Sequence, residues 1–565
     1  MLGGSARMAG KSAQGVTRRP EEASSPGLVT ADEWVARVLL EAGVRVVTAF
    51  PGATIQGIVE RLGRFRWAAE VEVRWVFSPR AAFEEAHGAS LAGRKSAACL
   101  SGEALGEAYP ALVAAARIGC GAGLLVIVGD DPGAWDSFAE MDSRSLLASA
   151  GVPTLEPSQL PELGRMIPEG FRLSRLYDVP VALRLCTPLM EEQVPVAGAS
   201  VIAPGREVSD GKFPTGARLS LPMAASAHQQ RLQARLEHLA HVSRLSRFAE
   251  VVGSGTKGIV AAGYAYAKLA NFLGDGPPDS LRVLKLGQVV PLPSYILLEF
   301  LLQTDEVLVL EEGEPFVERE LRSLLAEVLN RPQVLGRLSG AIPHEGELQS
   351  WEIEEALRQL LPGEAVEKPV FPTSGIRRRA MLPAMCPGCW LEPVRQALAI
   401  VRLEGDPERR PVVVGDHGCP AFLASAREPL VDVLGAPGSA IHLAIGRALA
   451  QPERSVLAIT GDYGFLARGL AELADPLVHQ LPVTILLVDN GGSAYTGGPR
   501  RRLASGVELE DVLGSLNLPL LRVIQDLGTE RVRATLAESL KARRLALVVL
   551  RFPCMLLEEA DADAL

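Results

Sequence analysis

The stretch "ITGDYGFLARGLAELADPLVHQLPVTILLVDNGGSAYTGG", residues 459–498, places two apolar strands around a helical segment. The first strand runs into Gly461 and Asp462, and the second ends at Asp489 and Asn490 before a glycine-rich loop. Parallel strands of an open α/β sheet present their carboxyl ends at one edge, where such folds bind ligands. The stretch therefore predicts a doubly wound unit in which Asp462 and Asn490 meet at the strand tips.

The residue types at these tips suit a metal-bound phosphate group. One carboxylate, one amide oxygen and a loop carbonyl suit Mg²⁺, which prefers oxygen ligands and often binds together with a diphosphate. Glycines let backbone N–H groups approach phosphate oxygens. The alternative is that Asp462 and Asn490 only cap the segments that follow them.

The same alternation of apolar strands and helices continues outward along the chain, with strands such as "VRVVTAF" (44–50), "GLLVIVG" (123–129) and "GIVAAG" (258–263). Continuous apolar strands between helices are typical of parallel sheets covered on both faces. We therefore expect an α/β protein with three doubly wound parallel-sheet domains. The expected division is a flexible tail (1–28), a first unit (29–195), a linker with a polar helix (196–250), a second unit (251–365), a third unit (376–557) and an acidic tail (558–565).

Composition limits the class of protein. A hydrophobic share of 48% with 22% charged residues is typical of packed globular proteins. The net charge of −10 argues against general binding to nucleic acid or anionic membranes, and the run Arg500–Arg502 is interpreted as a solvated loop. No membrane span or signal peptide is recognisable, which predicts a cytoplasmic protein, with an organelle transit peptide as the alternative interpretation of the first residues.

The seven cysteines are too sparse for a disulfide scaffold. Three of them, Cys99, Cys120 and Cys186, lie in apolar surroundings and are expected in the core. The others fall in "AMCPGCWLEPV", "GDHGCPAF" and "VVLRFPCMLL" and can converge near one edge of the third sheet. Four thiolates suit a [4Fe–4S] cluster or zinc, and their spacing does not separate these metals from unmetallated thiols. The four are Cys386, Cys389, Cys419 and Cys554.

A Gly-Asp pair followed by an Asn about 28 residues later resembles the thiamine diphosphate motif. The loop "DNGGSAYTGG" is especially similar to that of the alpha subunit of indolepyruvate:ferredoxin oxidoreductase. Further segments resemble the same family in the same order between residues 29 and 555: "FPGATIQGI", "FEEAHGASLAG", "VIVGDDPGAW", "MDSR", "LEPS", "GQVVPLP", "CPGC" and "GDHGC".

The resemblance implies a first unit that binds the coenzyme's pyrimidine, a second that resembles the transketolase C-terminal domain, and a third that binds the diphosphate. It implies Asp462, Asn490 and the carbonyl of Gly492 as Mg²⁺ ligands. Related 2-oxoacid:ferredoxin oxidoreductases hold a cluster near the thiamine, which implies a [4Fe–4S] cluster on the four cysteines named above. The implied coenzyme-binding positions are Gly415, Asp416, His417, Gly461, Asp462, Tyr463, Gly464, Asn490, Gly491, Gly492 and Thr496.

Family members decarboxylate aryl 2-oxoacids on thiamine diphosphate, pass electrons singly through iron–sulfur clusters to ferredoxin and make an acyl-CoA. A smaller second subunit completes such an enzyme, so the resemblance implies a heteromer. The family's C-terminal ferredoxin-like domain is not expected here, because the chain ends soon after Cys554. A partner or another external acceptor would then take the electrons.

The sequence departs from the family on the substrate side. Relatives carry the Glu that activates thiamine where this chain has Pro79, and Ser101 and Gly102 replace a Lys-His pair. The nearby Glu84, Glu85 and His87 are interpreted as a polar helix face or an interface. Three hypotheses follow: a 2-oxoacid oxidoreductase with a remodelled pocket, a non-catalytic or regulatory partner subunit, and a non-oxidative decarboxylase or carboligase. The 2-oxoacid, the use of CoA and the catalytic residues stay unassigned.

Overall fold

The fold is taken from a computed structural model, which describes residues 27–65, 70–195, 221–242, 248–274, 276–328, 331–363, 385–403, 410–424, 429–492 and 509–555. Thr496, the run at 500–502, the first 26 residues and the acidic tail, which were all the subject of sequence expectations, lie outside these residues. Strands in the described part form three large sheets and one small two-stranded pair.

The first sheet has seven strands in the order β12-β6-β7-β5-β4-β2-β3. Its strands are parallel except that β12 pairs with β6 in the antiparallel sense. The central strands are fully buried because helices cover both faces, as their continuous apolar sequences predict. The strands are β2 (Val46–Ala49), β3 (Glu72–Trp75), β4 (Ser96–Ser101), β5 (Leu124–Asp130), β6 (Thr154–Leu155), β7 (Val181–Cys186) and β12 (Gln288–Val290).

Amphipathic helices cover this sheet and share one core with it. Several begin at a side chain that accepts from the first turn, as Ser78 does for α3 and Ser101 does for α4. The short strands β1 (Leu28–Thr30) and β8 (Gln193–Pro195) pair beside them. The helices are α1 (Ala31–Glu41), α2 (Ala53–Arg64), α3 (Pro79–Leu91), α4 (Gly102–Ile118), α5 (Ser143–Ala150), α6 (Leu163–Tyr177) and α7 (Thr187–Met190).

The polar helix expected in the linker is α8 (Ala225–Val242). Its Leu232 and Leu239 are buried in the core of the first sheet, and α8 packs against α4. The helix is therefore an additional cover of the first unit, because its few apolar positions have a hydrophobic surface to bury against.

The second sheet has five strands in the order β14-β13-β10-β11-β9. Its edge strand β9 runs antiparallel to β11. An edge strand of a doubly wound sheet can be antiparallel because it needs no crossover helix, so the first sheet is mixed at β12 and the second at β9 within the expected α/β class. The elements are β9 (Ala249–Gly253), β10 (Lys257–Ala262), α9 (Tyr264–Leu273), β11 (Leu281–Leu286), α10 (Ser294–Leu301), β13 (Glu306–Leu310), α11 (Phe316–Leu324), β14 (Gln333–Leu335) and α12 (Ser350–Leu360).

The third sheet is fully parallel, with six strands in the order β16-β15-β17-β18-β20-β19. Separate apolar cores lie on its two faces. Its strands are β15 (Val412–Asp416), β16 (Val433–Gly435), β17 (Val456–Gly461), β18 (Val483–Asp489), β19 (Leu521–Ile524) and β20 (Ala546–Arg551). Its helices are α13 (Leu391–Leu403), α14 (Ala421–Ala424), α15 (Ala440–Ala450), α16 (Asp462–Gly464), α17 (Leu470–Glu472), α18 (Ala474–Val478), α19 (Leu509–Gly514) and α20 (Thr529–Lys541).

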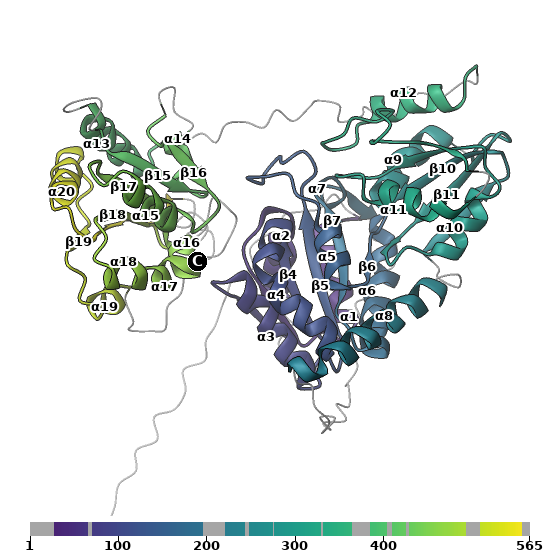
Figure 1. The fold of residues 1–565 in the computed structure, drawn as a ribbon, viewed down its shortest axis with the longest axis horizontal. Helices are drawn as coiled ribbons and strands as arrows, with labels where there is room; N and C mark the ends of the chain where they lie inside the picture. Colours follow the sequence, from purple (N-terminus) through teal and green to yellow (C-terminus); the bar gives the residue numbers. More distant parts are fainter. Residues whose placement is uncertain are drawn as a thin grey trace, which may run out of the picture.

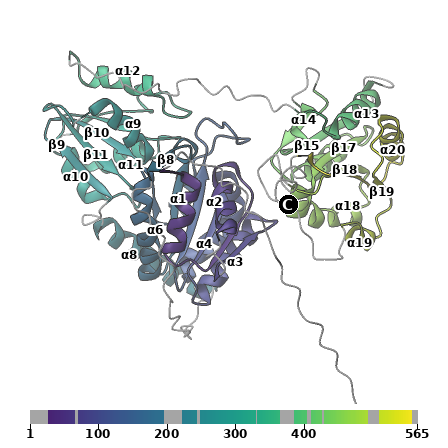
Figure 2. The same ribbon diagram turned by 180° about the vertical axis from the view of Figure 1, so that it is seen from behind.

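The predicted α/β class is confirmed, with three sheets that are parallel or mixed. In Figures 1 and 2 the first two sheets (purple to teal) lie side by side, and the third (green to yellow) lies next to the first. Every described helix is too short or too polar to span a lipid bilayer.

Candidate functional site

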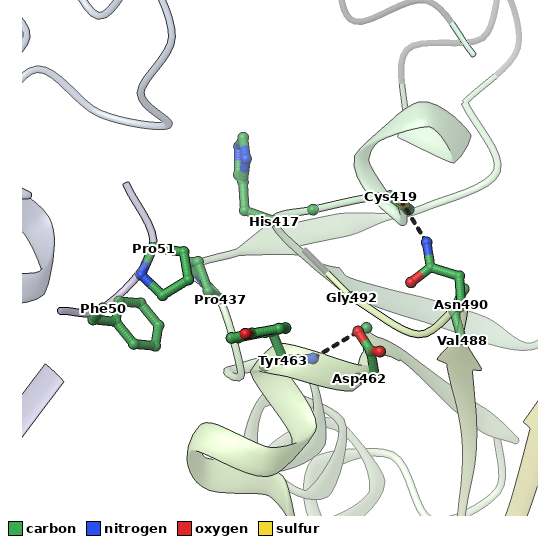
Figure 3. A pocket seen from close by; sticks show the side chains of 13 residues that line it. Phe50, Pro51, His417, Cys419, Pro437, Asp462, Tyr463, Val488, Asn490 and Gly492 are labelled. Carbon is green, nitrogen blue, oxygen red and sulfur yellow. Dashed lines mark hydrogen bonds between the residues drawn. The ribbon is translucent and has the colours of Figure 1, made fainter. Parts of the chain in front are cut away.

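The site lies at the carboxyl edge of the third sheet. Strands β15, β17 and β18 are neighbours, and Gly461 at the tip of β17 pairs with Val488 of β18. The loops that follow these strand tips therefore lie close together at one edge of the sheet. Asp462, directly after Gly461, and Asn490, two residues after Val488, line one pocket of about 590 Å³, including space open to solvent (Figure 3).

The pocket joins two parts of the chain. Phe50 and Pro51, at the end of β2 in the first unit, face a larger group of residues from the third unit across it (Figure 3). Sequence reasoning missed these two as pocket residues, although their place after a strand tip was a usable signal. The third-unit lining is His417, Gly418, Cys419, Pro437, Gly461, Asp462, Tyr463, Gly464, Val488, Asn490 and Gly492.

Asp462 is 2% exposed and begins the short helix α16. Its Oδ1 accepts a hydrogen bond from the backbone N–H of Tyr463 at 2.9 Å, inside the first turn, whereas the N-cap position of α16 is Gly461, which has no side chain to form a capping bond. Phe465–Gly469 then continue as a π-helical turn, a distortion that is frequent at functional sites. The hydrogen bond of Asp462 and ligand binding are compatible, because a carboxylate has several lone pairs.

Asn490 is 5% exposed, and both its backbone and its side chain form hydrogen bonds. Its backbone carbonyl accepts from the N–H of Cys554 at 3.1 Å, and its Nδ2 donates to Sγ of Cys419 at 3.4 Å. Figure 3 shows the amide oxygen on the side that faces the pocket. The amide orientation therefore offers an oxygen, rather than an N–H group, to a ligand.

Asp416, one of the implied coenzyme-binding residues, is absent from the pocket lining. It is fully buried, and its Oδ2 accepts from Thr460 Oγ1 at 2.6 Å and from the Gly438 N–H at 2.9 Å. Burial raises its pKa to about 7, although these hydrogen bonds lower it. Asp416 therefore supports the loop before α15 and lies behind the pocket lining.

Glycine is required at Gly464, because a Cβ there would lie 2.9 Å from the Gly438 nitrogen and 3.2 Å from Asp416 Oδ2. This close approach brings α16 against the loop that Asp416 holds. Among the implied coenzyme-binding residues, Gly415, Asp416 and Gly491 are absent from the pocket lining, Thr496 lies outside the described residues, and the rest line the pocket.

Two aromatic contacts connect the pocket to the first unit. The rings of Phe77 and Tyr463 have centroids 5.3 Å apart, and those of Phe138 and His417 are also 5.3 Å apart. Burial lowers the pKa of His417, so its imidazole is neutral at neutral pH. The first unit therefore forms one wall of the site, as the lining by Phe50 and Pro51 indicates.

That wall has no carboxyl group at Pro79, which is the first residue of α3. Glu84 is exposed and pairs with Arg80, and Glu85 pairs with Arg74, in agreement with a polar helix face. His87 departs from this expectation, because it is only 8% exposed and its Nε2 lies 2.8 Å from the carbonyl oxygen of Gly119. The buried side of α3 and the end of α4 thus hold this imidazole inside the fold.

The four candidate cluster cysteines are half-buried free thiols near the same edge. Burial, together with smaller electrostatic effects of Cys554, Cys389 and Asp462, raises the pKa of Cys419 to about 12, although the hydrogen bond from Asn490 lowers it. Burial also raises the pKa of Cys389, which interacts with Cys386 and Cys554. The thiols therefore form one connected group, whereas Cys99, Cys120 and Cys186 are buried core residues as expected.

The donor sets differ in how well they fit the implied groups. Asp462, Asn490 and Gly492 line one pocket and supply a carboxylate, an amide oxygen and a backbone carbonyl, which fits Mg²⁺ with a diphosphate. Among the described residues, no three His, Cys, Asp or Glu side chains are arranged to hold a metal ion. The thiols thus have the right chemistry for a cluster but not its ligand geometry.

Comparisons with known proteins agree with the chemistry of the pocket. Residues 416–548 match the family described as "Thiamine pyrophosphate enzyme, C-terminal TPP binding domain". The chain is a homologue of proteins named "Indolepyruvate oxidoreductase subunit IorA". It is 27% identical to that of Methanothermobacter marburgensis (94% of this chain, 87% of the relative) and 26% identical to that of Archaeoglobus fulgidus (93% and 86%).

Among solved structures, a 2-oxoglutarate:ferredoxin oxidoreductase from Magnetococcus marinus, with 2-oxoglutarate, coenzyme A and succinyl-CoA bound, is similar with a TM-score of 0.44. The two chains are 16% identical, and the similarity covers 55% of this chain and 61% of that one.

Proposed function

We propose that this chain is the large subunit of a thiamine diphosphate-dependent oxidoreductase that decarboxylates an aryl 2-oxoacid. The observation that carries the proposal is the pocket in which Asp462, Asn490 and Gly492 offer three oxygen ligands at the tips of adjacent parallel strands. Homology to the indolepyruvate oxidoreductase subunits supports the choice of an aryl substrate.

In the proposed holoenzyme the carboxylate of Asp462, the amide oxygen of Asn490 and the carbonyl of Gly492 hold Mg²⁺, which in turn holds the coenzyme's diphosphate. The bound coenzyme supplies the carbanion chemistry of decarboxylation. The chain's own residues orient and shield it. Phe50, Pro51 and Val488 present apolar surface to the pocket, which limits the access of water.

The proposal includes a [4Fe–4S] cluster on Cys386, Cys389, Cys419 and Cys554. Its support is the electrostatic contact among the four thiols and the hydrogen bond from Asn490 to Cys419, which links the thiol group to the proposed Mg²⁺ ligands. Since the thiols do not have a metal-ready arrangement, cluster binding requires their side chains to rearrange and lose their protons.

The division of labour among the units is also proposed. Residues 29–195 would face the pyrimidine, residues 376–557 would hold the diphosphate, and residues 251–365 would take the place of a transketolase C-terminal-like domain. A smaller subunit, CoA and ferredoxin or another electron acceptor complete the proposed reaction. The relatives' names designate them as subunits, which supports the search for such a partner.

The test begins with calorimetry of the anaerobically purified chain with thiamine diphosphate and MgCl₂, compared with the Asp462→Asn variant. Saturable, Mg²⁺-dependent binding that is lost in the variant is expected. The same preparation is analysed for iron, sulfide and zinc and then mixed with indolepyruvate and an artificial electron acceptor.

The outcomes separate the three hypotheses. Binding together with 2-oxoacid-dependent reduction of the acceptor supports the oxidoreductase. Binding and CO₂ release without reduction identifies a non-oxidative decarboxylase or carboligase. Binding without turnover in the presence of the smaller subunit points to a regulatory role, and no binding by the wild-type chain rejects the proposal.

A further inference from the structure

On the side of the first unit, the described lining of the proposed coenzyme site has no acidic or basic group. The pocket lining there consists of Phe50 and Pro51, which cannot exchange protons. Thiamine chemistry needs a carboxyl group near the pyrimidine ring, and the residue at the expected place is Pro79. If the proposed function is the premise, another carboxyl group of this chain has to serve the pyrimidine ring.

The strand tips of the first sheet show which residues of the first unit lie near the pocket. Strands β2 and β3 end at the third unit, since Phe50 and Pro51 line the pocket and Phe77 packs on Tyr463. The next tip is that of β4, because β4 pairs with β2 on its other side. The two tips touch, since a Cβ on Gly52 would lie 2.9 Å from the Cβ of Ser101. The residues after Ser101 are therefore next to the pocket wall.

Glu103, in the first turn of α4, lies between two contacts with the third unit. One turn later on the same helix face, Glu107 lies 3.7 Å from Nη1 of Arg468. On the other side, the hydroxyl of Ser137 hydrogen-bonds to Glu103, and the neighbouring Phe138 packs on the pocket residue His417. Glu103 thus occupies the face of the first unit that meets the site.

Other carboxylates near this edge already have partners in the chain. Asp130 pairs with Arg184, and Asp131 accepts from the Thr187 hydroxyl at 2.9 Å and from two backbone N–H groups. Glu84 pairs with Arg80 in the first turn of α3, and Glu85 pairs with Arg74 of β3.

Glu103 differs from them in its partners and in its environment. Within the described residues it forms no ion pair, and its side chain hydrogen-bonds to the hydroxyls of Ser101 and Ser137. Burial raises its pKa, and the charge of Asp130 raises it further. Although the hydroxyls of Ser101 and Ser137 lower this pKa, the net effect is that the carboxyl group keeps its proton to a higher pH than an exposed carboxyl group does, which favours a role in proton transfer.

We propose that Glu103 supplies the carboxyl group that exchanges a proton with the pyrimidine ring of the coenzyme, in the role that Pro79 cannot fill. In this role the O–H bond of the Glu103 carboxyl group would break and its proton would pass to a ring nitrogen of the bound coenzyme. Glu103 would be left as a carboxylate and the positive charge would move with the proton, so no oxidant or further reactant would be required.

The test measures proton chemistry without substrate turnover. The wild-type chain and Glu103→Gln are loaded with thiamine diphosphate and Mg²⁺, transferred to D₂O, quenched in acid and analysed by NMR for exchange at the thiazolium C2 carbon. Exchange is expected to be at least about tenfold slower in Glu103→Gln, while the coenzyme Kd from calorimetry changes less than about threefold. Glu107→Gln is the matched control, because it lies one turn away on the same face, and its exchange rate is expected to equal that of the wild type.

Glu103→Asp keeps a carboxyl group and guards against a folding defect in the Gln variant. Its exchange rate is expected to lie between those of the wild type and Glu103→Gln. Equal exchange in the wild type and Glu103→Gln, with coenzyme bound to both, overturns the role of Glu103 and leaves the proposed function intact. If the wild-type chain binds no coenzyme, both proposals are rejected. If Glu103→Gln does not fold, exchange in Glu103→Asp as fast as in the wild type overturns the proposal, and slower exchange supports it.

Discussion

The carboxyl edges of the first and third sheets carry similar sequences, but their acidic side chains have different surroundings. "VIVGDDPGAW" ends β5 with Asp130 and Asp131, and "AITGDYG" ends β17 with Asp462. In the first sheet, Asp130 pairs with Arg184, and Asp131 accepts from the Thr187 hydroxyl and two backbone N–H groups. In the third sheet, Asp462 lines an open pocket. The difference teaches that the same Gly-Asp pattern at a strand tip can serve contacts inside the fold in one sheet and line a pocket in another.

The arginines of the first edge form a buried network that reaches the second sheet. Arg144 is fully buried and donates to Asp142 and, through Nη1 at 2.8 Å, to Oε2 of Glu311. Arg184 pairs with Asp130 and, at 3.1 Å, with Glu156. Although burial raises the pKa of Asp142, Arg144 and Arg184 together hold it well below its usual range. These contacts stabilise the junction of the first two units.

The largest expected effect comes from breaking this network. Arg144→Met leaves Asp142 and Glu311 buried without their shared cation, so the free energy of unfolding should fall by about 3–5 kcal/mol. Urea unfolding followed by circular dichroism measures it. The control is Arg172→Met, since that arginine is exposed on α6 and pairs with Glu169 at the surface; a change under about 1 kcal/mol is expected. A similarly small change for Arg144→Met would contradict the structural role of the network.

The opposite pattern is expected at the third edge. Under the proposed function, Asp462→Asn removes the charged ligand of the pocket, and the Kd for thiamine diphosphate with Mg²⁺ should rise roughly 100-fold, equivalent to about 2.7 kcal/mol of binding free energy. The free energy of unfolding without ligands should change by less than about 1 kcal/mol, because Asn has the same size and its Oδ1 can still accept the hydrogen bond from the Tyr463 N–H. Calorimetry and urea unfolding give the two values. Asp475→Asn, at an exposed position of α18, is the control, and an unchanged Kd in Asp462→Asn would remove the distinction between the edges.

Asp416 sharpens the comparison, because it is an acid of the third edge that is buried like those of the first but has only neutral partners. The pKa of Asp416 in the folded state is about 7, which exceeds the ordinary value of 3.8 for an aspartate. The folded state therefore keeps the proton in a pH range where the unfolded chain has released it. Stability from this group is therefore full below about pH 4 and is lost as the pH rises to 7, by up to about 1.4 kcal/mol per pH unit.

Asp416→Asn should remove this part of the pH dependence, because the amide does not titrate. Urea unfolding of the wild type and the variant at several values between pH 4 and 8 measures the difference. Parallel stability profiles for the two proteins would show that the Asp416 proton does not contribute. Asp432→Asn is a suitable control, since that carboxylate pairs with Arg402 near the surface.

The smallest expected effect concerns the contact that joins the two edges. Phe138 and His417 pack with centroids 5.3 Å apart, and such aromatic pairs contribute about 0.5–1.5 kcal/mol. A double-mutant cycle with Phe138→Ala and His417→Ala, followed by urea unfolding, should give a coupling energy in this range. A coupling energy near zero would indicate that the two edges are not in contact in solution.

The sequence predicted the individual strands and helices well, because hydrophobic periodicity reports burial directly. It also located the pocket residues of the third sheet, because strand order in a parallel sheet converts a Gly-Asp and an Asp-Asn at strand ends into neighbours in space. It gave no signal for the short antiparallel edge strands β9 and β12, or for the two leucines of the polar helix α8 that are buried in the first core. Short segments carry too few periodic positions to reveal their partners.

By itself, the sequence determined the α/β class, the meeting of Asp462 and Asn490 at neighbouring strand tips and the buried positions of Cys99, Cys120 and Cys186, since each follows from local pattern. Only the tertiary structure decided that Phe50 and Pro51 face Asp462, that Asn490 donates to Cys419, and that Glu107 lies against Arg468. Contacts between units depend on how complete surfaces fit together, and residue spacing along one chain does not encode that fit in any periodic form.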